Sequence, residues 1–342
     1  MTAFTVRWDP HAIRVGDRPP HPERTMLVEA RGALLYWDAL DLRPHPAAEV
    51  FDARAAGEWL WEVYGPETAA DVLDGAASVA TEWDSPVLAA ARNLALLHWA
   101  GAWWPASHAA AVPALPADLL RAETAWYTAG LDHLLDDEAA VERALADVDL
   151  TALTGRTDHE TAALAADLAD LADAFGVELR SAAMRREDWA LAAGGAEPGL
   201  AVASGSAPID WSLVPARALD AAGEATWRFE NRSGAWMLAV TAPAAPGAVP
   251  TALTAVVGAV EVPLHYDPDT NTFGGEAPAP PEFAMRLGGG RPIEVRSPGY
   301  VADGPDRASS DPDRAERRAA LVAFARERLA SPAATLTERS AA

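Results

Sequence analysis

The segment from residue 98 to residue 108 gathers more chemically useful side chains than any other part of the sequence. Its six candidate residues are His98, Trp99, Trp103, Trp104, Ser107 and His108. A serine beside a histidine can become a nucleophile, because the imidazole can take the hydroxyl proton. The sequence contains no Gly-x-Ser-x-Gly turn, and no acidic residue stands out as the group that would orient the histidine. We therefore interpret the six residues as candidates for binding a partner or ligand, with catalysis as the alternative.

A weaker group of candidates surrounds a histidine in the acidic middle of the chain. Asp132, His133 and Asp136 carry the residue types that bind divalent metals. The sequence lacks the His-Glu-x-x-His and Glu-x-x-His spacings with which helices usually present metal ligands. A solvated acidic surface is therefore the favoured interpretation, and the sequence predicts no bound metal.

Two absences narrow the chemistry further. The chain has no cysteine, and all 27 of its basic residues are arginine. Without cysteine there is no thiolate nucleophile and no iron–sulfur cluster. Without lysine there is no Schiff base with pyridoxal phosphate and no P-loop lysine for a nucleotide. We expect no cofactor. Whether the lack of lysine reflects codon bias or selection stays open.

Acidic residues dominate the charge. The formal net charge is −23, and residues 108–178 alone hold three arginines against fifteen acidic residues. Such a chain repels the phosphates of nucleic acids, so we expect no direct nucleic-acid binding. The acidity either keeps the surface solvated or attracts a basic protein. We expect a protein partner; whether this partner is basic, and whether the chain forms homo-oligomers, stay open.

The distribution of tryptophan allows two interpretations. Nine of the thirteen tryptophans fall within residues 1–126. Tryptophan buries a large area in a core, but it is also enriched at interfaces and in pockets. Both roles remain open for this part of the chain.

The first residues show no basic region followed by an apolar run, so we expect no secretory signal. No stretch approaches 18 consecutive strongly apolar residues, and we therefore expect no membrane insertion. The sequence predicts a cytoplasmic protein.

Hydrophobic periodicity divides the chain and predicts an α+β fold. Residues 1–195 are predicted to form a mainly helical domain with short strands at its start. One helix has clear start and stop signals: Ser85 can cap it, Pro86 is its first residue, and Pro105 ends it after Trp104. Residues 196–206 are typical of a linker. Short alternating segments over 207–300 predict an antiparallel β-sandwich. A loop, a C-terminal helix and a tail follow over 301–342.

One resemblance accompanies these patterns. The run from His98 to Ser107, the acidic helices after it, and the stretch from Asp210-Trp211 through Ala225-Thr-Trp-Arg-Phe resemble uncharacterised multidomain proteins of high-GC actinobacteria. This resemblance implies no activity and no site residue. The sequence as a whole favours a non-catalytic protein-binding or adaptor protein. The alternative is a hydrolase or metal-dependent enzyme with its site in the helical domain.

Overall fold

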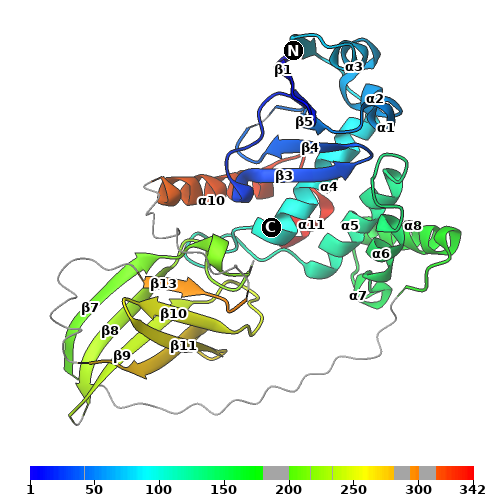
Figure 1. Ribbon diagram of the computed structural model, residues 1–342. Helices are drawn as coiled ribbons and strands as arrows, with labels where there is room; N and C mark the ends of the chain where they lie inside the picture. Colours follow the sequence, from blue (N-terminus) through cyan, green and yellow to red (C-terminus); the bar gives the residue numbers. More distant parts are fainter. Residues whose placement is uncertain (42, 180–199, 216, 233, 281–292, 300–312) are drawn as a thin grey trace. The chain divides into compact units, whose positions relative to one another are not determined.

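The computed structural model describes residues 1–342 apart from 42, 180–199, 216, 233, 281–292 and 300–312 (Figure 1). The chain divides into two compact units. Unit 1 comprises Met1–Gly101, Leu115–Arg185 and Arg328–Ala342, and unit 2 comprises Ala102–Ala114 and Arg186–Glu327. Each unit is therefore assembled from separate stretches of chain, whereas the sequence indicated contiguous domains over 1–195 and 207–300.

Unit 1 contains a six-stranded antiparallel sheet with the strand order β3-β4-β5-β2-β1-β6. The strands are β1 (Thr2–Trp8), β2 (Ile13–Val15), β3 (Thr25–Ala30), β4 (Ala33–Asp38), β5 (Ala47–Val50) and β6 (Ser78–Thr81). The β3–β4 hairpin turns at Gly32, whose φ is +72°. A Cβ atom there would lie 2.6 Å from the carbonyl oxygen of Asp52, so the turn requires glycine.

Three short helices separate β5 from β6, and a long helix follows β6. They are α1 (Ala53–Gly57), α2 (Leu60–Tyr64), α3 (Pro66–Leu73) and α4 (Pro86–Trp103). Ser85 caps α4 by accepting the Leu88 N–H at 3.0 Å, as the Ser-Pro start predicts. Helix α4 contacts the turn that precedes β3, because the Trp99 indole N–H donates to the carbonyl oxygen of Glu23 at 2.8 Å.

The remaining helices of unit 1 enclose a second core. They are α5 (Ala117–Gly130), α6 (Ala140–Ala146), α7 (Leu150–Thr154), α8 (His159–Phe175) and α11 (Leu336–Ala341). Leucine and alanine side chains from α5 to α8 fill this core, and Leu336 packs against it. The residues after α10 (Arg314–Ala330) therefore form a docked helix, although the sequence indicated only a tail.

Unit 2 is built on seven antiparallel strands in the order β13-β10-β11-β12-β9-β8-β7 (Figure 1). They are β7 (Leu200–Pro208), β8 (Glu224–Arg232), β9 (Ala235–Pro243), β10 (Leu253–Val257), β11 (Val260–Asp267), β12 (Thr272–Pro278) and β13 (Ile293–Arg296). Alternate residues of β8, including Trp227 and Phe229, point into a shared core. Trp227 lies directly over Gly205 of β7, where a Cβ atom would be 2.8 Å from the indole nitrogen.

The α+β class is confirmed, with three differences in detail. Unit 1 carries a full six-stranded sheet where the sequence predicted a mainly helical domain with short strands. The strands of unit 2 form one continuous, nearly closed sheet where the sequence predicted a two-sheet sandwich. Residues 200–206 belong to β7, although the sequence indicated a linker over 196–206. Residues 196–199 lie outside the described residues.

Candidate functional site

The six residues predicted from the 98–108 segment do not form one site. Trp99 is 2% exposed and belongs to the core of unit 1. His98, also in unit 1, is exposed beside the backbone of Leu27. The other four residues belong to unit 2, where Trp104 is buried and donates its indole N–H to the carbonyl oxygen of Pro113 at 2.9 Å.

Trp103 and Trp104 do line a hollow in unit 2 together with Trp211. Its volume is about 30 Å³, which suits one or two water molecules rather than an organic ligand. The indole nitrogen of Trp211 is buried and has no hydrogen-bond partner among the described residues. We assign the hollow no further role.

Ser107 hydrogen-bonds to a carboxylate rather than to a histidine. Its hydroxyl donates to Asp220 Oδ1 at 2.7 Å and accepts the Ala110 N–H at 2.9 Å. The backbone N–H of His108 donates to Asp220 Oδ2 at 2.7 Å, while the His108 side chain is exposed. Because Ser107 and Asp220 are 1% and 2% exposed, this pair holds residues 102–114 within unit 2 and offers no opening to a substrate.

The weak metal candidates also remain apart. His133 Nε2 lies 3.2 Å from Glu62 Oε1, and the side chains of Asp132 and Asp136 are exposed. Within the described residues, no three His, Asp or Glu side chains are placed to hold a metal ion together.

Exposed aromatic residues gather instead in the segment that contains the three short helices. We call the exposed side chains of residues 51–85 the α1–α3 surface. Phe51, Trp61 and Trp83 on this surface are 54%, 45% and 37% exposed. The segment is compact, because Trp83 packs on Gly65 between α2 and α3, and the Thr68 hydroxyl donates to the carbonyl oxygen of Ala80 in β6.

Both indoles of the α1–α3 surface are held by their N–H groups. Trp61 Nε1 donates to the carbonyl oxygen of Glu58, and Trp83 Nε1 donates to that of Glu62, each at 3.0 Å. The polar end of each side chain is therefore already satisfied. A partner can therefore contact only the aromatic rings of these indoles. The hydrogen bond of each indole fixes the orientation of its ring.

The charged side chains of this segment are almost all acidic. Residues 52–85 contain eight acidic residues and one basic residue, Arg54. Five of the carboxylates are exposed and form no ion pair with another described residue: Glu58, Glu67, Asp71, Asp74 and Asp84. The α1–α3 surface thus combines fixed indole rings with unneutralised negative charge.

Sequence reasoning missed this surface, although one local signal was available. Trp59 and Trp61 are two positions apart, which places them about 200° apart on a helix. They cannot both face the core. Trp59 faces it and is 1% exposed, so Trp61 must face outward.

The nine N-terminal tryptophans divide between the two roles that the sequence left open. Trp37, Trp59, Trp99 and Trp104 are buried, Trp103 is half-buried, and Trp8, Trp61, Trp83 and Trp126 are exposed.

A buried histidine supports Trp83 from inside unit 1. The Nε2 of His45 lies 2.7 Å from the carbonyl oxygen of Trp83, and its Nδ1 lies 3.1 Å from the Thr2 hydroxyl. Because a carbonyl oxygen only accepts, Nε2 carries a proton and donates it to the Trp83 carbonyl. Burial lowers the pKa of His45, and the hydrogen bond to Trp83 only partly opposes this shift.

We expect this histidine to make unit 1 less stable in mild acid. The pKa of His45 is lower in the folded chain than in the unfolded chain, so the unfolded chain binds the extra proton more readily. The free energy of unfolding should be at its full value above about pH 6.5 and should fall as the pH decreases through the unfolded-state pKa. Urea titrations of wild type and His45→Gln between pH 5 and 8 measure this difference.

The variant should lose this part of the pH dependence, while replacement of the exposed His11 by glutamine should leave the profile unchanged. Equal slopes for wild type and His45→Gln would contradict the assignment.

Fold and surface together describe a two-unit α+β protein with an acidic, aromatic surface on unit 1. No protein-family model, no curated protein and no solved structure matches this chain. None of the helices in the described ranges is both long enough and apolar enough to cross a membrane.

Proposed function

We propose that this protein is a non-catalytic adaptor that binds a basic segment of another protein on the α1–α3 surface. The observation that carries the proposal is the pair of exposed tryptophans, Trp61 and Trp83, fixed by their N–H groups among unpaired carboxylates. Aromatic anchors of this kind dominate the binding energy of many protein interfaces.

The chemistry of the surface favours a cationic partner. An exposed indole ring attracts a guanidinium or ammonium group, which contributes about 0.5–1 kcal/mol at an exposed site and more once water is excluded. Neighbouring carboxylates add charge-assisted hydrogen bonds to the same cation. Since the indole N–H groups are already used, a partner rich in hydrogen-bond acceptors would gain less from these rings than an arginine-rich one.

A peptide of alternating arginine and glycine tests the proposal by calorimetry at physiological ionic strength. The variant Trp61→Ala/Trp83→Ala keeps every charge of the protein. We expect it to bind the peptide at least tenfold more weakly than wild type, because two cation–ring contacts are lost.

Trp126→Ala is the matched control, since Trp126 is 41% exposed on α5, outside the α1–α3 surface. It should bind like wild type. Circular dichroism must show that each variant is folded, and Trp61→Ala alone serves if loss of Trp83 from Gly65 unfolds the segment. Equal affinity for all variants would mean that net charge alone attracts the peptide, and would overturn the proposal.

A further inference from the structure

Unit 1 contains a cavity of about 180 Å³ that is separate from the α1–α3 surface. Residues from four parts of the unit line it: Phe4 of β1, Arg18 after β2, Tyr36 and Trp37 of β4, and Arg43 and His45 before β5. This volume is similar to that of an engineered protein cavity, about 150 Å³, that accepts benzene. The cavity therefore suits a ligand with one ring or a similarly compact body.

Aromatic side chains form the apolar part of the cavity wall. Phe4, Tyr36 and Trp37 are each at most 5% exposed. Their polar atoms are engaged elsewhere: the Tyr36 hydroxyl lies 3.4 Å from Glu49 Oε2, and Trp37 Nε1 donates to the carbonyl oxygen of Pro44. Burial raises the pKa of Tyr36, so its hydroxyl stays neutral near pH 7. These residues present carbon surface to the cavity.

The charged residues of the cavity are paired, with one exception. Asp17 binds Arg7, Asp38 binds Arg24, and Asp41 binds Arg43. The exception is Arg18, which forms no hydrogen bond or ion pair with any described residue.

Arg18 is instead held against an aromatic ring. Its guanidinium carbon lies 5.2 Å from the centroid of the Tyr36 ring, and its side chain is otherwise exposed. The N–H groups of a guanidinium lie in its own plane and point outward from it. A guanidinium that lies over a ring can therefore still donate hydrogen bonds from these N–H groups. The cavity thus has one cation, lying over the Tyr36 ring, whose hydrogen-bond donors have no partner among the described residues.

We propose that this cavity binds a small monocarboxylate with an aromatic or compact apolar body, and that Arg18 receives the carboxylate. The guanidinium edge matches a carboxylate in a two-point hydrogen bond, and the aromatic wall accommodates the apolar body. The three lining carboxylates are already neutralised, so they leave no counterion for a ligand amine. An inorganic phosphate could bind the guanidinium, but it would gain nothing from the aromatic wall.

Benzoate is a suitable probe, and Trp37 is a suitable reporter because it lines the cavity. The indole N–H signals of the thirteen tryptophans can be followed by ¹H–¹⁵N NMR, with Trp37→Phe assigning the signal of Trp37. We expect benzoate to shift the Trp37 signal in a saturable manner with a millimolar or lower Kd. The signal of Trp126 should stay unchanged.

Arg18→Gln should weaken benzoate binding at least tenfold, whereas Arg121→Gln should leave it unchanged, since Arg121 is an exposed residue of α5. Benzamide, a neutral molecule of the same shape, should bind at least tenfold more weakly than benzoate. Absence of a Trp37 shift would overturn the proposal. So would equal binding of benzamide, unchanged binding to Arg18→Gln, or tighter binding of inorganic phosphate.

Discussion

Replacement of Asp220 by alanine is expected to lower the free energy of unfolding of unit 2 by about 3 kcal/mol, because it leaves buried donors without their acceptor. The Asp220 carboxylate is 2% exposed and accepts three hydrogen bonds, from the Ser107 hydroxyl and from the backbone N–H groups of His108 and Ala222. Urea denaturation measures the loss. Hydrogen exchange should show that residues 102–114 lose protection first.

Matched variants separate this effect from a general loss of acidic charge. Asp269→Ala removes an exposed carboxylate from the same unit and should change the unfolding free energy by less than about 0.5 kcal/mol. Ser107→Ala should cost about 1–2 kcal/mol, and the double variant should cost less than the sum of the two, because both side chains serve one hydrogen bond. A change below about 1 kcal/mol in Asp220→Ala would contradict this role.

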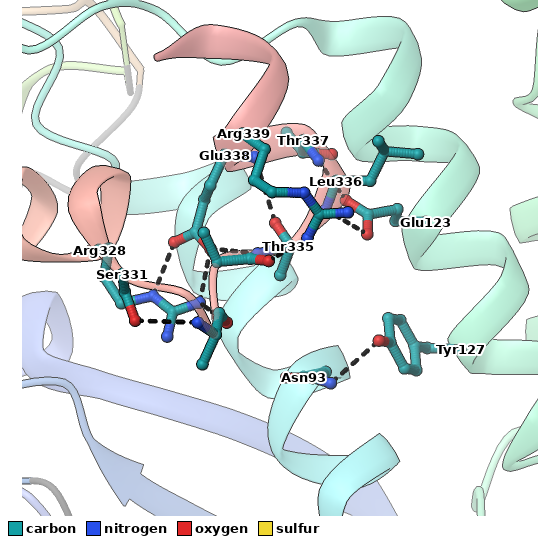
Figure 2. Close-up of polar contacts among 12 residues, drawn as sticks. Asn93, Glu123, Tyr127, Arg328, Ser331, Thr335, Leu336, Thr337, Glu338 and Arg339 are labelled. Atoms are coloured by element: carbon teal, nitrogen blue, oxygen red, sulfur yellow. Dashed lines mark hydrogen bonds and ion pairs between the residues drawn. The ribbon is translucent and has the colours of Figure 1, made fainter. Parts of the chain in front are cut away.

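The second large effect concerns the docking of α11 on α5. Glu123 of α5 is 7% exposed, and its carboxylate accepts the backbone N–H groups of Leu336 and Thr337 at 2.9 and 2.6 Å. The next free N–H, that of Glu338, is accepted by the Thr335 hydroxyl (Figure 2). Every donor in the first turn of α11 therefore has a partner, and two of the three depend on Glu123.

We expect Glu123→Ala to destabilise unit 1 by about 3 kcal/mol and to release the C-terminal segment. Hydrogen exchange and limited proteolysis over residues 331–341 would detect the release. The remaining contacts of this segment, such as the ion pair of Arg328 with Glu338 shown in Figure 2, lie within residues 328–342 or involve other partners, and they do not replace the lost acceptor.

Glu123→Gln keeps one good acceptor and should have an intermediate effect, while Glu142→Ala, at an exposed position of α6, should have almost none. Wild-type protection of residues 331–341 in Glu123→Ala would show that docking does not depend on this carboxylate.

Local patterns predicted local structure well. The Ser-Pro start and the proline after Trp104 bracket a helix, and α4 spans Pro86–Trp103. Strict alternation over 225–230 predicted a strand paired with the next one, and β8 and β9 form this hairpin. In both cases, the signal lies within about twenty residues of chain. The capping residues and the periodicity of the apolar side chains are enough to predict these two elements.

Contacts between residues far apart in the chain leave no comparable signal in the sequence. Thr2 of β1 pairs with Thr81 of β6, and Ser107 meets Asp220 across 113 residues. Nothing near Ser107 in the sequence marks Asp220 as its partner, which is why a serine bound to a structural carboxylate resembled half of a nucleophilic pair. The cavity beside Arg18 is hidden for the same reason, since strands distant in sequence must first pair before its walls meet.

The discontinuity of unit 1 has a consequence for the order of synthesis. Because residues 328–342 belong to this unit, a ribosome has added every residue of unit 2 before unit 1 can close. Until then, Glu123 lacks the backbone donors that it binds in the finished fold. A chain whose translation stops before Leu336 keeps this carboxylate without its partners and leaves the adjoining apolar core open. Unit 1 therefore keeps apolar surface open to proteases for as long as the synthesis of residues 124–335 takes.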